Sequence, residues 1–252
     1  MKTLKCYIIE SLIEYKNTDI TQPAVEEYIN TNYEIKGKLT VEDINGVCIV
    51  NCDGDVTVKN KGIEKLTDGF KWGKVKKLFN CSNCNNLKTL EGSPEEAWDF
   101  YCASCRNLKS LEGGPKLIRS RFDCSNCNNL RSIEGAPRFV GGNFICSWCE
   151  NLESLKGAPR ALNKTFNCDH CNSLKSLVGV PKKIKSTFNC SSCKNLESLK
   201  GAPTEVGKDF YCNGCSKLKS LEGAPENVGG YFYCNDCPDL KITDSDRKKY
   251  KI

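Results

Sequence analysis

Paired cysteines carry most of the chemistry that this sequence could perform. The stretch FNCSSC at residues 188–193 places Cys190 and Cys193 three positions apart, and similar pairs recur along the chain. A CxxC pair followed 17 or 18 residues later by another falls within the spacing of four-cysteine zinc sites. Zinc would be held by Cys81, Cys84, Cys102 and Cys105, and by the equivalent later pairs.

Two other roles compete with zinc binding. The first cysteine of each pair follows a phenylalanine by two positions, so both side chains lie on one face of a strand and point inward. Free cysteine is among the most buried residue types and behaves as a small hydrophobe. Every repeat carries the same pair, whereas zinc sites shared between neighbouring repeats would alternate two repeat types. The pattern favours buried thiols and no cofactor over zinc; a redox or disulfide role is the third alternative.

The cysteine pairs belong to an internal repeat. Its unit Phe-x-Cys-x-x-Cys recurs at a spacing of 21 residues once and 22 residues six times. The phenylalanines are Phe79, Phe100, Phe122, Phe144, Phe166, Phe188, Phe210 and Phe232. Seven units continue with Leu-x-x-Leu/Ile-x-Gly-x-Pro, in which Gly-x-Pro turns the chain. This short period predicts a solenoid with one parallel sheet of short strands and irregular or 3₁₀ segments on the opposite side.

The repeat resembles the Leu-x-Leu-x-x-Asn/Cys-x-Leu core of leucine-rich repeats. It is similar also to the BspA-like, or treponemal, subfamily, whose repeats carry a Phe-x-x-Cys-x-x-Leu pattern. The segments LEGAP at 221–225 and VGG at 228–230 are similar to uncharacterised repeat proteins of tailed bacteriophages. The resemblance covers residues 79–242. It implies a leucine-rich-repeat-like right-handed superhelix and, for a phage protein, the cytoplasm of a bacterial host cell.

The flanking regions predict caps for the solenoid. Residues 1–55 read as a small α/β cap, residues 56–78 as a degenerate first rung, and residues 243–252 as a polar C-terminal tail. Apolar spacing predicts a short helix over residues 4–15 and a second helix beginning near Pro23.

Alternating residues after position 38 predict short strands in the cap. Asn45-Gly46 and Asp53-Gly54 are the turn signals between them. In the first rung, Ile63, Leu66, Trp72 and Val75 resemble the apolar positions of the later rungs.

Composition narrows the function classes. No apolar run approaches the roughly 20 residues that a membrane span needs, so no membrane partner is expected. The first residues lack a secretory cleavage site, which predicts a reducing, cytoplasmic setting for the 19 cysteines. The single histidine, His170, leaves no catalytic constellation. We therefore expect neither an enzyme nor a small-molecule substrate.

Two outward-facing columns form the candidate binding face. One column holds the residue after each phenylalanine, and the other holds the variable residue directly before each second cysteine. Aromatic residues on such a face are typical interface anchors. The predicted partner-binding residues are Tyr101, Asp123, Ile145, Trp148, His170, Tyr211 and Tyr233.

A basic stripe is the second candidate surface. Residues 113–190 carry 12 lysines and arginines against five acidic residues, within a chain of net charge +6. Its members are Lys116, Arg119, Arg121, Arg138, Arg160, Lys164, Lys182, Lys183 and Lys185. A stripe of this kind suits phosphate backbones or acidic proteins.

These observations predict a non-enzymatic interaction protein that binds a protein partner through the sheet face. The phage resemblance implies a host protein, such as a defence or nuclease complex that the chain would inhibit. The alternatives are a nucleic-acid-binding protein that uses the basic stripe, and a zinc-binding CxxC repeat protein.

Overall fold

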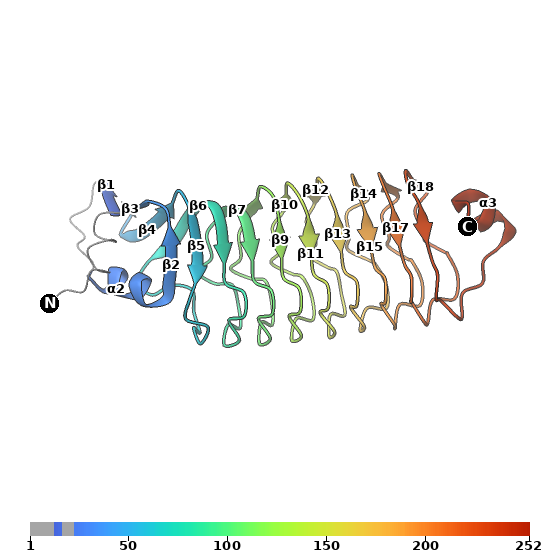
Figure 1. Cartoon of the computed structure of the whole chain (residues 1–252), viewed down its shortest axis with the longest axis horizontal. Coiled ribbons are helices and arrows are strands. Elements are labelled where there is room, and N and C mark those ends of the chain that lie inside the picture. The colour runs from blue at the N-terminus through green and yellow to red at the C-terminus, as the bar shows by residue number, and fades with distance from the viewer. Residues whose placement is uncertain (1–12, 17–22) are drawn as a thin grey trace.

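The computed structural model describes residues 13–16 and 23–252 and is an elongated β-solenoid (Figure 1). Successive rungs lie side by side along the long axis, with the N-terminal cap at one end and helix α3 at the other. This architecture, with its parallel sheet and few helices, confirms the predicted fold class. Within the described residues, no helix is long and apolar enough to cross a membrane.

The first ladder of strands is built from the Phe-x-Cys segments, and we call it ladder A. Its strands are β6 (Lys71–Asn80), β7 (Glu96–Tyr101), β9 (Phe122–Asp123), β11 (Phe144–Ile145), β13 (Phe166–Asn167), β15 (Phe188–Asn189), β17 (Phe210–Tyr211) and β19 (Phe232–Tyr233). Each pairs in parallel with the next, phenylalanine beside phenylalanine. Neighbouring ring centroids lie 4.9–5.5 Å apart. The buried rings therefore form a continuous stack along the axis.

A second ladder follows the prolines, in segments expected to be irregular or 3₁₀; we call it ladder B. Its strands are β8 (Leu117–Ile118), β10 (Phe139–Val140), β12 (Ala161–Leu162), β14 (Lys183–Ile184), β16 (Glu205–Val206) and β18 (Asn227–Val228). Each strand buries its second residue, at least in part. The strands pair in parallel as β8–β10–β12 and as β14–β16–β18, with no pairing between β12 and β14, and this pairing satisfies backbone groups. Strand β7 is long enough to join both ladders, because it pairs with β8 and with β9.

The Gly-x-Pro turn between the ladders needs its glycine. Gly135 has a φ of +89°, a left-handed conformation that glycine adopts without a steric cost. A Cβ built on Gly135 would lie 2.4 Å from the backbone nitrogen of Glu112 in the preceding rung. The close approach of neighbouring rungs therefore excludes a larger residue at this turn.

The N-terminal cap combines one helix with four strands before the solenoid sheet. Helix α2 (Pro23–Asn32) begins where the sequence predicts and buries Val25 and Ile29. The strands are β1 (Ile13–Lys16), β2 (Tyr33–Lys36), β3 (Leu39–Ile44) and β4 (Val47–Cys52). The helix predicted over residues 4–15 is wrong at its end, because Ile13–Lys16 pairs in parallel with β3 as a strand. Its other residues lie outside the described part of the chain.

The residues before Phe79 supply apolar side chains to the start of the core. Ile63, Leu66, Trp72 and Val75 are buried. Strand β5 (Asp55–Val58) pairs in parallel with β6 and antiparallel with β2. The cap therefore covers the first edge of the solenoid with a strand of opposite direction, and it protects that edge from further parallel pairing.

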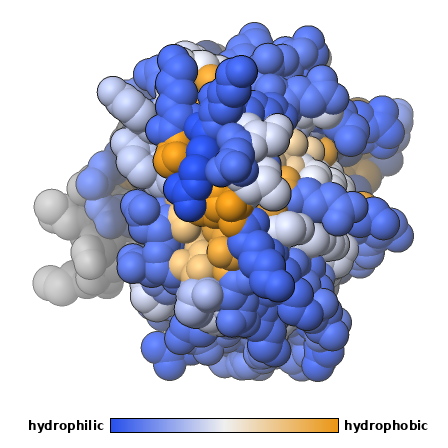
Figure 2. All heavy atoms as spheres, turned by 90° about the vertical axis from the view of Figure 1, so that its right-hand side faces the viewer, coloured by the Kyte–Doolittle hydropathy of each residue, from blue (hydrophilic) through white to orange (hydrophobic). Residues whose placement is uncertain are grey.

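Residues 243–252, the polar C-terminal tail of the sequence, contain a helix that packs on the last rung. Thr243 caps helix α3 (Asp244–Tyr250) through a capping box with Asp246. The Tyr250 ring stacks on Phe232 at 4.2 Å between centroids, and its hydroxyl donates to the Pro225 carbonyl at 2.7 Å. Figure 2 shows a mostly hydrophilic end with a small apolar patch between polar groups. Tyr250 thus ends the phenylalanine stack.

Replacing Tyr250 with Ala should loosen the last rungs. The change removes an aromatic pair and a hydrogen bond, a loss of about 1–3 kcal/mol. Hydrogen exchange measured by mass spectrometry should become faster over residues 210–240, while residues 79–145 keep their protection. Lys248→Ala on the exposed side of the same helix is the matched control. Equal protection in both variants would show that Tyr250 does not close this end.

Candidate functional site

The second cysteines of the pairs form hydrogen bonds between rungs. Cys193 Sγ donates to the carbonyl oxygen of Cys168 in the preceding rung at 3.2 Å. The same bond, at 3.1–3.3 Å, is made by Cys105, Cys127, Cys149, Cys171, Cys215 and Cys237. These thiols therefore supply a donor to carbonyl groups that lie inside the solenoid, away from water.

The first cysteines bond in the opposite direction along the axis. Cys146 Sγ donates to the Asn167 carbonyl of the following rung at 3.5 Å, and Cys190 Sγ donates to the Tyr211 carbonyl at 3.3 Å. All cysteines that the structure describes are free thiols, and those from Cys81 to Cys215 are buried. From Cys124 to Cys215, the two columns of thiols thus connect each rung to both of its neighbours.

Burial raises the pKa of most of these thiols and favours their protonated form, although hydrogen bonds from neighbouring cysteines lower the pKa of Cys105 and Cys215. It raises the pKa of Cys84 to about 12, from the ordinary 9.0. It also raises the pKa of Cys102, Cys124 and Cys212 well above that value. A metal ligand or a redox cysteine has to be a thiolate, which is the form that burial disfavours here.

The cysteines of the described residues are not gathered into a metal-binding group. Among residues 13–16 and 23–252, no group of three or more His, Cys, Asp or Glu side chains is placed to hold a metal ion. The zinc alternative required pairs on adjacent rungs to converge on a common point. Their sulfur atoms instead donate to backbone carbonyls, so the zinc prediction has no geometric support.

The residue before each second cysteine has a left-handed backbone. The φ angle lies between +56° and +66° at Asn83, Ser104, Asn126, Trp148, His170, Ser192, Gly214 and Asp236. Its N–H reaches the next rung: Trp148 N donates to the Asp169 carbonyl at 2.8 Å. We call this the left-handed column. Asn, Asp and Gly tolerate this conformation, so the variable residues of the column share a backbone constraint as well as an exposed position.

Trp148 and His170 are the exceptions in that column. Their rings stack at 3.7 Å between centroids and 8° between planes. Trp148 is 50% exposed, so packing does not explain its presence. His170 Nδ1 lies 2.9 Å from Asp169 Oδ2, which orients the imidazole ring. The structure thus brings two of the predicted contact residues together on adjacent rungs.

The column after the phenylalanines has a structural role at four rungs. Asn167 Oδ1 accepts from the backbone N–H of Asp169, two residues on, at 3.1 Å. Equivalent bonds are made by Asn80, Asp123 and Asn189. The prediction that Asp123 is exposed is wrong: it is 7% exposed and also pairs with Arg121 at 2.6 Å. Tyr101, Ile145, Tyr211 and Tyr233 depart from this bonding pattern.

A second aromatic cluster lies near the C-terminal end. Tyr211 and Tyr233 stack at 4.6 Å between centroids, and Tyr231 lies 5.9 Å from Tyr233. Tyr231, which is 70% exposed, and Trp98, which is 51% exposed, were not among the predicted contact residues. Both lie just before a repeat phenylalanine, at positions that carry small or polar residues in most rungs. A large aromatic residue at a position that is small or polar in most rungs was the sequence signal for both.

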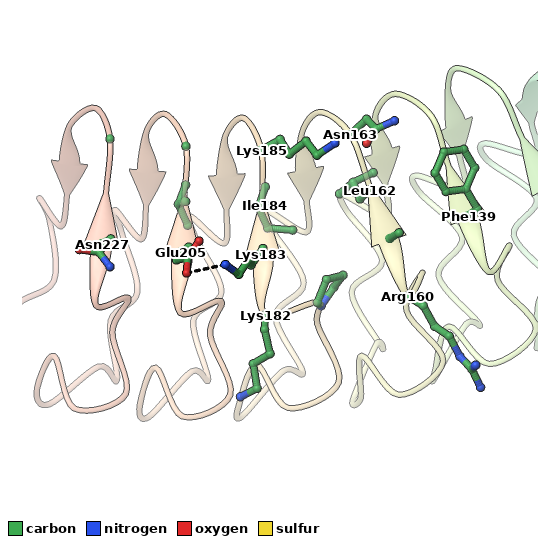
Figure 3. Close-up of a pocket in the computed structure, with 15 residues that line it drawn as sticks. Phe139, Arg160, Leu162, Asn163, Lys182, Lys183, Ile184, Lys185, Glu205 and Asn227 are labelled. Atoms are coloured by element: carbon green, nitrogen blue, oxygen red, sulfur yellow. Dashed lines mark ion pairs between the residues drawn. The ribbon is translucent and has the colours of Figure 1, made fainter.

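The predicted basic stripe divides into paired and unpaired cations. Lys116 pairs with Glu95, Arg119 with Glu96, Arg121 with Asp123, and Lys183 with Glu205. No ion pair within the described residues involves the other five, which are Arg138, Arg160, Lys164, Lys182 and Lys185. Figure 3 shows the Lys183–Glu205 pair on ladder B, with Arg160 and Lys182 extending beyond the strands.

Comparisons with known proteins identify no relative. No protein-family model matches the chain, and neither a curated protein nor a solved structure matches it. The likeness to leucine-rich repeats, to their BspA-like subfamily and to phage proteins therefore rests on the repeat residues alone.

Cysteine substitutions test the bonds between rungs. Cys193→Ala removes the donor to the Cys168 carbonyl and should lower the free energy of unfolding by about 1–3 kcal/mol. Cys193→Ser keeps a donor and should cost less. Urea unfolding followed by circular dichroism measures both. If alanine is tolerated better than serine, the thiol acts only as a hydrophobe.

Alkaline pH should destabilise the fold. Most folded thiols, among them Cys84, Cys102 and Cys124, have raised pKa values, whereas the thiols of the unfolded chain ionise near the ordinary 9.0. Below that pH both states bind the proton; above it only the folded thiols keep it, so stability falls as pH rises. The slope is about 1.4 kcal/mol per pH unit for each thiol. Urea unfolding from about pH 8 to 10 measures this slope, and thiolate absorbance in fully native protein would contradict it.

Proposed function

We propose that this protein is a non-enzymatic interaction module that binds a protein partner through the face of ladder A. The observation that carries the proposal is Trp148, a large aromatic side chain held half-exposed in a left-handed backbone conformation. The repeat-solenoid fold is typical of interaction scaffolds and supports it.

Trp148 occupies a position whose left-handed backbone conformation favours other residue types. A left-handed conformation costs an ordinary L-residue about 1–2 kcal/mol. Five of the other positions in the column hold Asn, Ser or Asp within the repeats, and one holds Gly. Half of the Trp148 surface remains in water, so burial offsets little of the cost. Strain at an exposed aromatic residue is typical of a binding contact.

The surroundings of Trp148 suit a protein interface. His170 covers one side of its ring, and Asp169 holds the imidazole. Ile145 lies three residues before Trp148 and is half-buried. A preorganised aromatic anchor loses little side-chain freedom on binding. The tyrosine cluster of Tyr211, Tyr231 and Tyr233 offers a second anchor on later rungs.

The finer parts of the proposal rest on the phage resemblance. A phage-encoded module would act in the cytoplasm of a bacterial host, on a host protein such as a defence or nuclease complex that it inhibits. No cofactor and no small-molecule substrate are part of this proposal, because the cysteine sulfurs are engaged in backbone hydrogen bonds. Stoichiometric zinc in protein purified without added metal would contradict it.

Replacing Trp148 with Asn separates binding from folding. Asparagine adopts the left-handed conformation at a lower free-energy cost than tryptophan does. This difference offsets the loss of the stacking contact with His170, so the free energy of unfolding should change by no more than about 1 kcal/mol. Affinity for the partner should fall about 30-fold or more, as for an interface hot spot. The matched control is Trp98→Asn, which removes an equally exposed tryptophan elsewhere.

Quantitative capture from a nuclease-treated bacterial lysate identifies the partner. Wild type, Trp148→Asn and Trp98→Asn are compared, and a specific partner is one that only Trp148→Asn fails to retain. If the two variants retain the same proteins as wild type, the face of ladder A around Trp148 does not bind the partner.

A further inference from the structure

Four cations occupy the same repeat position on consecutive rungs of ladder B and form a column. Lys116, Arg138, Arg160 and Lys182 each follow the proline of their rung. Backbone hydrogen bonds join the first three: Arg138 N donates to the Lys116 carbonyl at 3.2 Å, and Arg160 N donates to the Arg138 carbonyl at 2.9 Å. One strand spacing, about 4.8 Å, therefore separates these three, and Lys182 follows on the next rung.

Three of these four cations have no acidic partner within the described residues. Lys116 has Glu95 at 3.4 Å, but no ion pair within the described residues involves Arg138, Arg160 or Lys182. All three are exposed. Like charges directly opposite one another destabilise a sheet. An anionic polymer along the column would remove this repulsion.

A groove runs beside the unpaired cations. It has a volume of about 970 Å³ and spans ladder B from Phe139 to Gly229. Small residues, among them Ala161 and Gly207, line the groove and occupy little of its volume. Figure 3 shows Arg160 and Lys182 at one end of the strands and Lys185 with Asn163 at the other. Cationic side chains thus border the groove on both sides.

Phe139 adds an aromatic surface to the groove. It lies next to Arg138 on strand β10, lines the groove, and is partly exposed. A cationic groove with an aromatic residue is the arrangement that binds single-stranded nucleic acid, in which phosphates meet the cations and a base stacks on the ring. A duplex keeps its bases paired and stacked on one another, so it would leave Phe139 without a base.

We propose that the ladder B groove binds single-stranded nucleic acid along the solenoid axis. Arg138, Arg160 and Lys182 contact successive phosphates, Lys185 contacts the strand from the other side, and Phe139 stacks on a base. This surface shares no residue with the Trp148 face, so the two binding activities are separable by mutation.

Fluorescence anisotropy with a labelled single strand of about 15 thymidines tests the groove. Arg160→Gln combined with Lys182→Gln should weaken binding at least tenfold. It should also reduce the slope of log affinity against log salt by about 1.4, from roughly 0.7 per phosphate contact. The matched control is Lys217→Gln with Lys219→Gln, which removes two exposed cations outside the groove. It should leave the slope nearly unchanged.

Phe139→Ala tests the stacking contact. It should weaken binding about fivefold or more while the salt slope stays constant. Trp148→Asn should bind the strand as wild type does, and the groove variant should still retain the protein partner. Failure of one proposal is thereby distinguishable from failure of the other.

Three results would overturn the proposal. The first is no binding of the strand at about 50 mM salt, where phosphate contacts are strongest. The second is an equal loss in the groove variant and in its control, which would show unspecific attraction by net charge. The third is a poly-glutamate peptide that displaces the strand at lower concentration than unlabelled thymidine strand does, which would assign the groove to an acidic protein segment.

Discussion

The hydrogen bond from a buried thiol to the carbonyl of the preceding rung is the interaction on which the solenoid depends. Most strands after β7 are two residues long, so ladders A and B satisfy only part of the backbone. The chain between them turns inside the solenoid and exposes carbonyl oxygens to an apolar interior. Cys193 and its equivalents supply the missing donors. Cysteine is small enough to stack on itself at one strand spacing and apolar enough to remain buried.

A core that repeats so closely leaves the surface free to vary. Each rung from Phe79 to Cys215 repeats the same buried phenylalanine and thiols, so a substitution on the outside does not have to be compensated within. Trp148 and His170 use a position that elsewhere holds Asn, Ser, Asp or Gly. Arg138, Arg160 and Lys182 use the position after the proline. The two proposed binding surfaces therefore lie on different ladders of one rigid frame.

The outermost strands at the two ends of the solenoid are covered in different ways. At the first edge, β5 pairs with β2 in the antiparallel direction. At the last edge, Tyr250 of α3 stacks on Phe232, although the helix itself buries no residue. The last rung is accordingly less covered, and Cys234 and Cys237 are only partly buried. The C-terminal rungs, which also carry the exposed tyrosines, should be the first to open.

The sequence by itself determined the solenoid, its period and its buried positions, because in-register repeats place identical residues on one another whatever the details of the turns. It also predicted Trp148, His170 and the unpaired cations as surface residues. Tertiary structure decided what lies beside each of them. Asp123 is buried and Lys116 is neutralised because their partners depend on local turn geometry or on a neighbouring rung. The left-handed backbone at Trp148 likewise follows from the next-rung carbonyl that its N–H must reach.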